Sequence, residues 1–239
     1  MSAMEPYEIT YRVLASDTDA YRRLRVSRLF TMLQEAAIAH TEFLGAGRDK
    51  TLDRGLLWVV TLQQAVIRRM PAYDDVIRLR SLPGEMLHAF YPRHYALTDG
   101  DGETLATASA LWALMDAETR TMVFPAQSGV AIPGAKPAWE TFFPAAPKLP
   151  QAAAEQRFTV PYSYVDLNGH MNNTRYFDLA EDLMPPALRA RPLCEVRTEY
   201  TGEARLGETI TLQTEAREDA FLLSGAADRR LFRIGMQYA

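Results

Sequence analysis

The chain has 239 residues, a formal net charge of -4, 48% hydrophobic residues and 23% charged residues. This length accommodates one large domain or two small ones, and the charge gives no argument for nucleic-acid binding. The single cysteine, Cys194, excludes an intramolecular disulfide framework and a cysteine-rich zinc site, and it fits a reducing compartment. Residues 1–10 lack a signal-peptide core, and no apolar run approaches the about 20 residues of a membrane span, so we expect a soluble cytoplasmic protein without stable membrane insertion.

The first half of the chain begins with a strand-like segment near Tyr11 and continues into an amphipathic helix. Apolar residues recur at helical spacing from Val26 to Phe43, and the Gly-Ala-Gly sequence at 45–47 predicts the end of this helix. Period-two and β-rich runs then predict four strands, at residues 57–68, 75–82, 88–98 and 104–116. The Asp-Gly-Asp-Gly sequence at 99–102 predicts a hairpin turn between the last two of these strands.

A proline-rich segment separates the two halves. Seven of the 14 prolines lie between Pro125 and Pro161, and such a segment is neither a central strand nor a helix interior. We therefore predict an N-terminal domain at 1–135, a semi-rigid linker at 136–155 and a C-terminal domain at 156–239.

The second half repeats the plan of the first. A shift of 147 positions aligns Asp19 with Asp166 and Phe30 with Phe177, among other matches. A strand-like segment again leads through a polar loop into an apolar-faced helix, and four strands are predicted at 194–201, 208–216, 220–226 and 230–238. The sequence therefore predicts an α+β protein in which a helix wrapped by an antiparallel sheet occurs twice.

The loop before the second helix carries the most informative polar residues. In an extended segment, Asp166, Asn168 and His170 would point to the same side and line one wall. Asn172 and Asn173 fall at the helix start, where backbone N–H groups lack helical partners and can stabilise an oxyanion. Turn formation and helix capping also explain Asn and Gly here, but one capping residue would suffice for that. The excess of polar residues favours an acyl-hydrolysing site.

These residues resemble those of the acyl-acyl carrier protein (acyl-ACP) thioesterase family, which is built from two hotdog domains in tandem. The resemblance rests mainly on residues 166–173 (DLNGHMNN), followed by Arg175 and Tyr176. Residues 197–200 (RTEY) resemble the segment that carries the family's catalytic glutamate. Weaker support comes from residues 112–116 (WALMD) with Thr119 and Arg120 shortly after.

The resemblance implies a site and a reaction. His170 and Asn168 would polarise the thioester or the attacking water. Either Glu199 or Asp166 would be the general base, with Glu199 favoured, and Asp166 would otherwise orient the network. The implied substrate is an acyl chain on the phosphopantetheine of acyl carrier protein (ACP), released as free fatty acid in fatty acid biosynthesis without a cofactor or metal. Plant members carry a cysteine after the glutamate, whereas Tyr200 stands here, which excludes a cysteine nucleophile at that position.

The resemblance also implies different roles for the two halves. The first half has Tyr21 and Arg23 where the second has Asn168 and His170, so we expect one site per chain, in the C-terminal half. The first half would form the acyl pocket, with candidate residues Met32, Leu33, Phe43, Leu57 and Trp58. Two domains already provide the pairing that lone hotdog domains achieve by dimerising, so the sequence leaves a homodimer open.

Carrier docking has several candidate residues. A basic run in this acidic chain is either a solvated surface or a docking patch for ACP, and it comprises Arg22, Arg23, Arg25 and Arg28. Arg68, Arg69, Arg189 and Arg191 are equal candidates for such a patch.

Three other functions stay open at this level. The chain could be an acyl-CoA thioesterase of the same fold, a double-hotdog enoyl-thioester hydratase or a catalytically silent acyl-binding protein. A silent protein would lack the polar trio, whereas Asp166, Asn168 and His170 are all present. The other histidines, His40, His88 and His94, have no metal-site spacing and are assigned structural roles.

Overall fold

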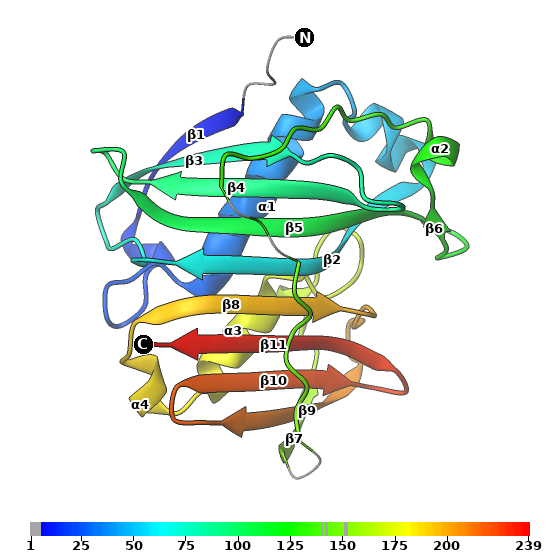
Figure 1. Ribbon diagram of the computed structural model, residues 1–239. Helices are drawn as coiled ribbons and strands as arrows, with labels where there is room; N and C mark the ends of the chain where they lie inside the picture. The colour runs from blue at the N-terminus through cyan, green and yellow to red at the C-terminus, as the bar shows by residue number, and fades with distance from the viewer. Residues whose placement is uncertain (1–5, 140, 142, 151–152) are drawn as a thin grey trace.

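A computed structural model of the chain describes residues 6–139, 141, 143–150 and 153–239. Within these residues the strands form one 11-stranded antiparallel sheet in the order β1-β3-β4-β5-β2-β8-β11-β10-β9-β7, with β6 paired to β5 (Figure 1). The N-terminal strands are β1 (Tyr7–Arg12), β2 (Leu56–Ile67), β3 (Val76–Pro83), β4 (Tyr91–Thr98), β5 (Thr104–Asp116) and β6 (Met122–Val123). The C-terminal strands are β7 (Ala154–Thr159), β8 (Leu193–Tyr200), β9 (Thr209–Ala216), β10 (Ala220–Ala226) and β11 (Arg230–Tyr238).

Two main helices cover one face of this sheet (Figure 1). They are α1 (Val26–Phe43) and α3 (Arg175–Leu183), and the shorter α2 (Pro125–Ser128) and α4 (Pro186–Arg189) accompany them. The apolar stripe of α1 is buried in the main core, as its spacing predicts. Phe30 of α1 stacks on Phe177 of α3 with ring centroids 4.2 Å apart, so the two helices meet through equivalent positions of the two halves.

The loop that leads into each helix has the same conformation in both halves. Thr18 pairs with Leu24, and Val165 pairs with Met171, at the same shift of 147 positions. Arg22 and Gly169 occupy equivalent left-handed positions with φ of 63° and 76°. The internal repeat predicted from the sequence is therefore confirmed.

The two halves share one sheet because β2 pairs antiparallel with β8, from Leu62 opposite Glu199 to Val66 opposite Glu195. The chain thus has the predicted α+β architecture of two hotdog units in tandem. The segment that connects the two units crosses the face of the sheet opposite the helices (Figure 1). Within this segment, Pro147 packs closely over Gly235 of β11. Strand β7 begins at Ala154, so the C-terminal unit starts before residue 156.

Neither a membrane-spanning helix nor a metal-binding cluster occurs among the described residues. No helix in it is long and apolar enough to cross a membrane. No group of three or more His, Cys, Asp or Glu side chains in the same residues is arranged to hold a metal ion.

Candidate active site

The segment with the polar trio is a tight turn rather than an extended strand, which corrects the sequence-based expectation. Asp166 N donates to His170 O at 3.0 Å, and Gly169 N donates to Asp166 O at 3.0 Å. Asp166 Oδ1 accepts a hydrogen bond from the backbone N–H of Asn168 at 2.9 Å, and Asp166 Oδ2 accepts one from Asn172 Nδ2 at 3.1 Å. Asp166 therefore braces the turn, while the side chains of Asp166, Asn168 and His170 still line one cavity.

His170 contacts two residues whose presence in the site the sequence does not predict. Arg120 Nη2 lies 3.0 Å from His170 Nε2 and 3.3 Å from His170 Nδ1. Glu203 Oε2 lies 3.4 Å from His170 Nε2, and Arg120 and Glu203 form a direct ion pair. His170 thus belongs to an imidazole, carboxylate and guanidinium cluster.

The fold brings these three residues together from separate elements. Arg120 lies in the turn between β5 and β6, with φ of 56°. Glu203 lies in the loop after β8. The backbone of His170 forms an isolated antiparallel β-bridge with Arg205 of the same loop. The N-terminal half therefore supplies a cation to a site that was expected to be built by the C-terminal half alone.

The surroundings of His170 favour the neutral imidazole. Burial lowers the pKa of His170 below its ordinary value of 6.5, and the positive charges of Arg120 and Arg205 lower it further. The negative charge of Glu203 raises it and opposes these effects. A neutral imidazole can accept a hydrogen bond at one ring nitrogen and donate at the other.

Glu199 does not lie in this site, so its predicted placement is wrong. Side chains alternate along a strand, and Thr198 and Tyr200 of β8 face the helices, with Thr198 fully buried. Glu199 therefore faces the opposite side of the sheet, where it pairs with Arg233, its direct neighbour on β11. Glu203, four residues later, reaches the cavity instead.

The expected oxyanion donors also differ in part. The backbone N–H of Asn172 donates to Tyr164 O at 2.8 Å, so it is not free to bind an oxyanion. The Asn173 side chain lines the cavity, and its Nδ2 is buried without a partner among the described residues. Tyr200 donates its hydroxyl to Asn173 O at 2.9 Å and so fixes the Asn173 backbone. Asn173 is therefore the better candidate for holding an oxyanion.

A cavity of about 670 Å³ extends from these residues between α1 and the strands of the N-terminal half. Of the five predicted pocket residues, Leu57 and Trp58 line it. The expectation for the others is wrong. Met32 and Leu33 are buried in the main core, and Phe43 is 76% exposed at the end of α1.

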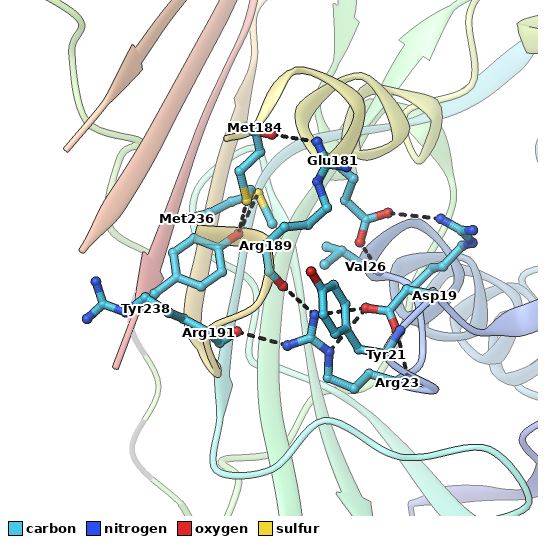
Figure 2. A network of polar contacts seen from close by, with 11 residues as sticks. Asp19, Tyr21, Arg23, Val26, Glu181, Met184, Arg189, Arg191, Met236 and Tyr238 are labelled. Atoms are coloured by element: carbon cyan, nitrogen blue, oxygen red, sulfur yellow. Dashed lines mark hydrogen bonds and ion pairs between the residues drawn. The ribbon is translucent and has the colours of Figure 1, made fainter. Parts of the chain in front are cut away.

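The basic run at the start of α1 is largely engaged within the chain, and Figure 2 shows the contacts of Arg23. Arg23 pairs with Asp19 at 2.9 Å and donates to the carbonyl oxygens of Arg189 and Arg191. Arg25 lies 3.9 Å from Glu181, and Arg28 pairs with Asp17 at 3.0 Å. Arg22 is exposed and forms no ion pair with a described residue, so it is the member of the run best placed to meet a partner.

Sequence signals existed for some of these corrections. The alternation along β8 from buried Val196 would have placed Glu199 on the outer face. Arg120 and Glu203 lie in turns with no periodic pattern, and only the fold brings them to His170. Cys194, the single thiol, lies at the start of β8 and outside the cavity lining.

Comparison with known proteins finds the same family along most of the chain. The acyl-ACP thioesterase N-terminal domain matches residues 5–126, and the C-terminal domain of that family matches residues 148–229. A palmitoyl-acyl carrier protein thioesterase of Cuphea hookeriana is 25% identical over 209 residues, covering 81% of this chain and 50% of the relative. One from Gossypium hirsutum is 26% identical over 220 residues, covering 85% and 53% respectively. The chain thus spans about half the length of these plant relatives.

Solved structures show the same fold over nearly the full length of the chain. An acyl-ACP thioesterase from Bacteroides thetaiotaomicron superposes with a TM-score of 0.87 at 20% identity, covering 97% of both chains. The 12:0-ACP thioesterase from Umbellularia californica superposes with a TM-score of 0.82 at 18% identity, covering 98% of this chain and 97% of that one.

Proposed function

Because the chain belongs to the acyl-ACP thioesterase family, we propose that it hydrolyses the thioester of an acyl-ACP to a free fatty acid and the carrier thiol. The observation that carries this proposal is the meeting of His170 and Glu203 at the cavity, beside Asn173 Nδ2, which has no partner among the described residues. A base, an imidazole and an oxyanion donor are the groups that thioester hydrolysis needs.

In the proposed reaction, Glu203 accepts a proton from water while the water oxygen bonds to the thioester carbonyl carbon. His170, neutral and 3.4 Å from Glu203, orients the water or the carbonyl group. Asn173 Nδ2 donates to the oxyanion of the tetrahedral intermediate. The C–S bond then breaks, and the carrier thiolate leaves and takes up the proton from Glu203. A thiolate is a good leaving group, so no covalent acyl-enzyme is required.

Asp166 and Arg120 act by positioning other groups in this proposal. Asp166 holds the turn through the Asn168 amide and Asn172 Nδ2, so it fixes the backbone that presents His170. Arg120 pairs with the Glu203 carboxylate and contacts the His170 ring. Asn168 is exposed at the cavity mouth, where it is placed to contact the phosphopantetheine arm.

The same proposal includes ACP as the carrier that delivers the substrate and the cytoplasm as the compartment. An acidic carrier would approach exposed arginines such as Arg22, whereas Arg23 is held within the chain. The single free cysteine is consistent with a reducing cytoplasm, where fatty acid synthesis would supply the substrate.

Thiol release from acyl-ACP tests this proposal, with wild type beside His170→Ala and Asn173→Ala. We expect wild-type turnover, and losses of about a hundredfold in each variant because an acid/base or oxyanion group is removed. Acyl-CoA of the same chain serves as the comparison that measures the contribution of the carrier. A folded wild type that releases no thiol from either substrate would contradict the proposal.

A further inference from the structure

An arginine is buried in the wall of the acyl cavity. Arg93 of β4 is 4% exposed, and its side chain points between the sheet and α1, where it contacts His40 and Thr41. It lines the same cavity as the candidate catalytic residues. A guanidinium stays charged in proteins, so this cavity contains a buried positive charge.

The hydrogen bonds of Arg93 leave part of its guanidinium free. Nη1 contacts His40 Nδ1 at 3.0 Å and donates to Ser81 Oγ at 3.5 Å, and Nη2 donates to Thr41 Oγ1 at 2.8 Å. A guanidinium has five N–H groups, so the Nε hydrogen and one Nη2 hydrogen have no acceptor among the described residues. Free N–H groups of a guanidinium donate strong hydrogen bonds to carboxylate oxygens.

No described carboxylate compensates this charge. Glu35 and Glu42 also line the cavity but are exposed, and Asp166 and Glu203 bond to other groups. The partners of Arg93 are neutral, since burial and the Arg93 charge lower the pKa of His40 to about 4. A buried cation without a counter-ion is unfavourable, and an anion from outside would relieve this.

We propose that the acyl cavity binds chains carrying an oxygen group remote from the thioester, with a terminal carboxylate as the best match for Arg93. The inference rests on the proposed thioesterase function and names the substrate class of that same site. Apolar residues such as Leu57, Trp58 and Trp112 would contact the methylene groups, and Arg93 would bind the oxygen atoms.

The test compares acyl-ACP substrates of equal chain length that end in a methyl, a hydroxyl or a carboxylate group, over a series of lengths. For wild type we expect the ratio of kcat/KM for the carboxylate chain over the methyl chain to peak at one length. In Arg93→Met this ratio should fall by about tenfold or more, because a hydrogen-bonded charge pair is lost. Arg233→Met removes a buried arginine outside the cavity and should leave the ratio unchanged.

A binding measurement separates this inference from the thioesterase proposal. Calorimetry with a free α,ω-diacid and the monoacid of equal length should show tighter binding of the diacid to wild type, and not to Arg93→Met. The wild-type comparison alone would support the inference even if wild type released no thiol, and the comparison with Arg93→Met applies once circular dichroism shows that the variant is folded. Equal or weaker diacid binding to wild type, or a kcat/KM ratio that Arg93→Met leaves unchanged, would overturn the inference.

Discussion

At the residue scale, the site depends on one cation from the other half of the chain. Arg120 Nη2 lies 3.0 Å from His170 Nε2 and pairs with Glu203, so one nitrogen contacts both the imidazole and the carboxylate. Its positive charge lowers the pKa of His170, after the larger effect of burial. Arg120 therefore acts on the protonation state of His170 as well as on the position of Glu203.

Replacing Arg120 by Met should raise the pKa of His170. With the positive charge removed, the imidazolium is less disfavoured and the charge of Glu203 stabilises it more. The acidic limb of the pH dependence of kcat/KM should move to higher pH, and kcat/KM at its optimum should fall by about 10- to 100-fold as Glu203 loses its fixed position. NMR titration of the His170 ring would follow the pKa directly.

Arg12→Met is the matched control for this variant. Arg12 pairs with Asp74 on the surface of the N-terminal half, away from the cavity lining. The control should leave both the His170 titration and the rate profile as in wild type. An unshifted His170 titration in Arg120→Met would contradict the electrostatic role of Arg120.

At the element scale, the turn of residues 165–171 is the element that presents His170. It recurs at residues 18–24, yet only the second copy has glycine at the left-handed position, Gly169, with φ of 76°. A Cβ at Gly169 would meet nothing within 4 Å, so the cost of a side chain there is conformational.

Gly169→Ala should destabilise the protein by about 1–2 kcal/mol, because alanine disfavours the left-handed region. Urea unfolding would measure this change. Gly100→Ala is the control, because Gly100 has equally open surroundings and lacks a left-handed φ. Equal stability of Gly169→Ala and wild type would show that the turn tolerates a side chain.

Most of the elements follow from local sequence patterns. The apolar spacing predicts α1 from Val26 to Phe43, and the alternation in the strands gives their limits to within one residue for most of them. The face of each side chain is harder to assign. Phe43 continues the helical pattern but lies at the exposed end of α1, and Glu199 lies on the outer face of β8. The alternation along β8 accounts for the position of Glu199, whereas the position of Phe43 depends on packing that local patterns do not encode.

At the scale of the whole molecule, the two halves are joined by buried polar contacts as well as by the shared sheet. Glu181 of α3 accepts the Val26 amide at the start of α1 at 3.2 Å (Figure 2). Burial raises the pKa of Glu181 from 4.5 to about 7, despite the opposing effect of this hydrogen bond. The site is similarly shared, since Arg120 and His170 come from different halves. No local pattern in either half predicts such contacts.

The raised pKa of Glu181 gives stability a defined pH dependence. The folded protein keeps the proton up to about pH 7, whereas the unfolded chain releases it near pH 4.5, so the free energy of unfolding falls as pH rises through this window. Glu181→Gln removes this titration. Its free energy of unfolding, relative to wild type, should therefore rise by about 1–3 kcal/mol between about pH 5 and pH 8.

Chemical denaturation at several pH values would measure this difference. Glu118→Gln, at an exposed position in the β5–β6 turn, is the control and should follow wild type. Parallel curves for wild type and Glu181→Gln across the window would contradict a raised pKa at the junction of the two halves.

Two carboxylates four residues apart allow a sharp test of the proposed site. Glu203 lies 3.4 Å from His170, whereas Glu199 pairs with Arg233 on the other face of the sheet. In steady-state thiol release from acyl-ACP, Glu203→Gln should lower kcat by about a hundredfold or more, because the general base is lost. Glu199→Gln should retain turnover within about threefold of wild type, since Glu199 is not among the residues that line the cavity. The opposite result, with turnover lost in Glu199→Gln and kept in Glu203→Gln, would contradict the assignment of Glu203 as the general base.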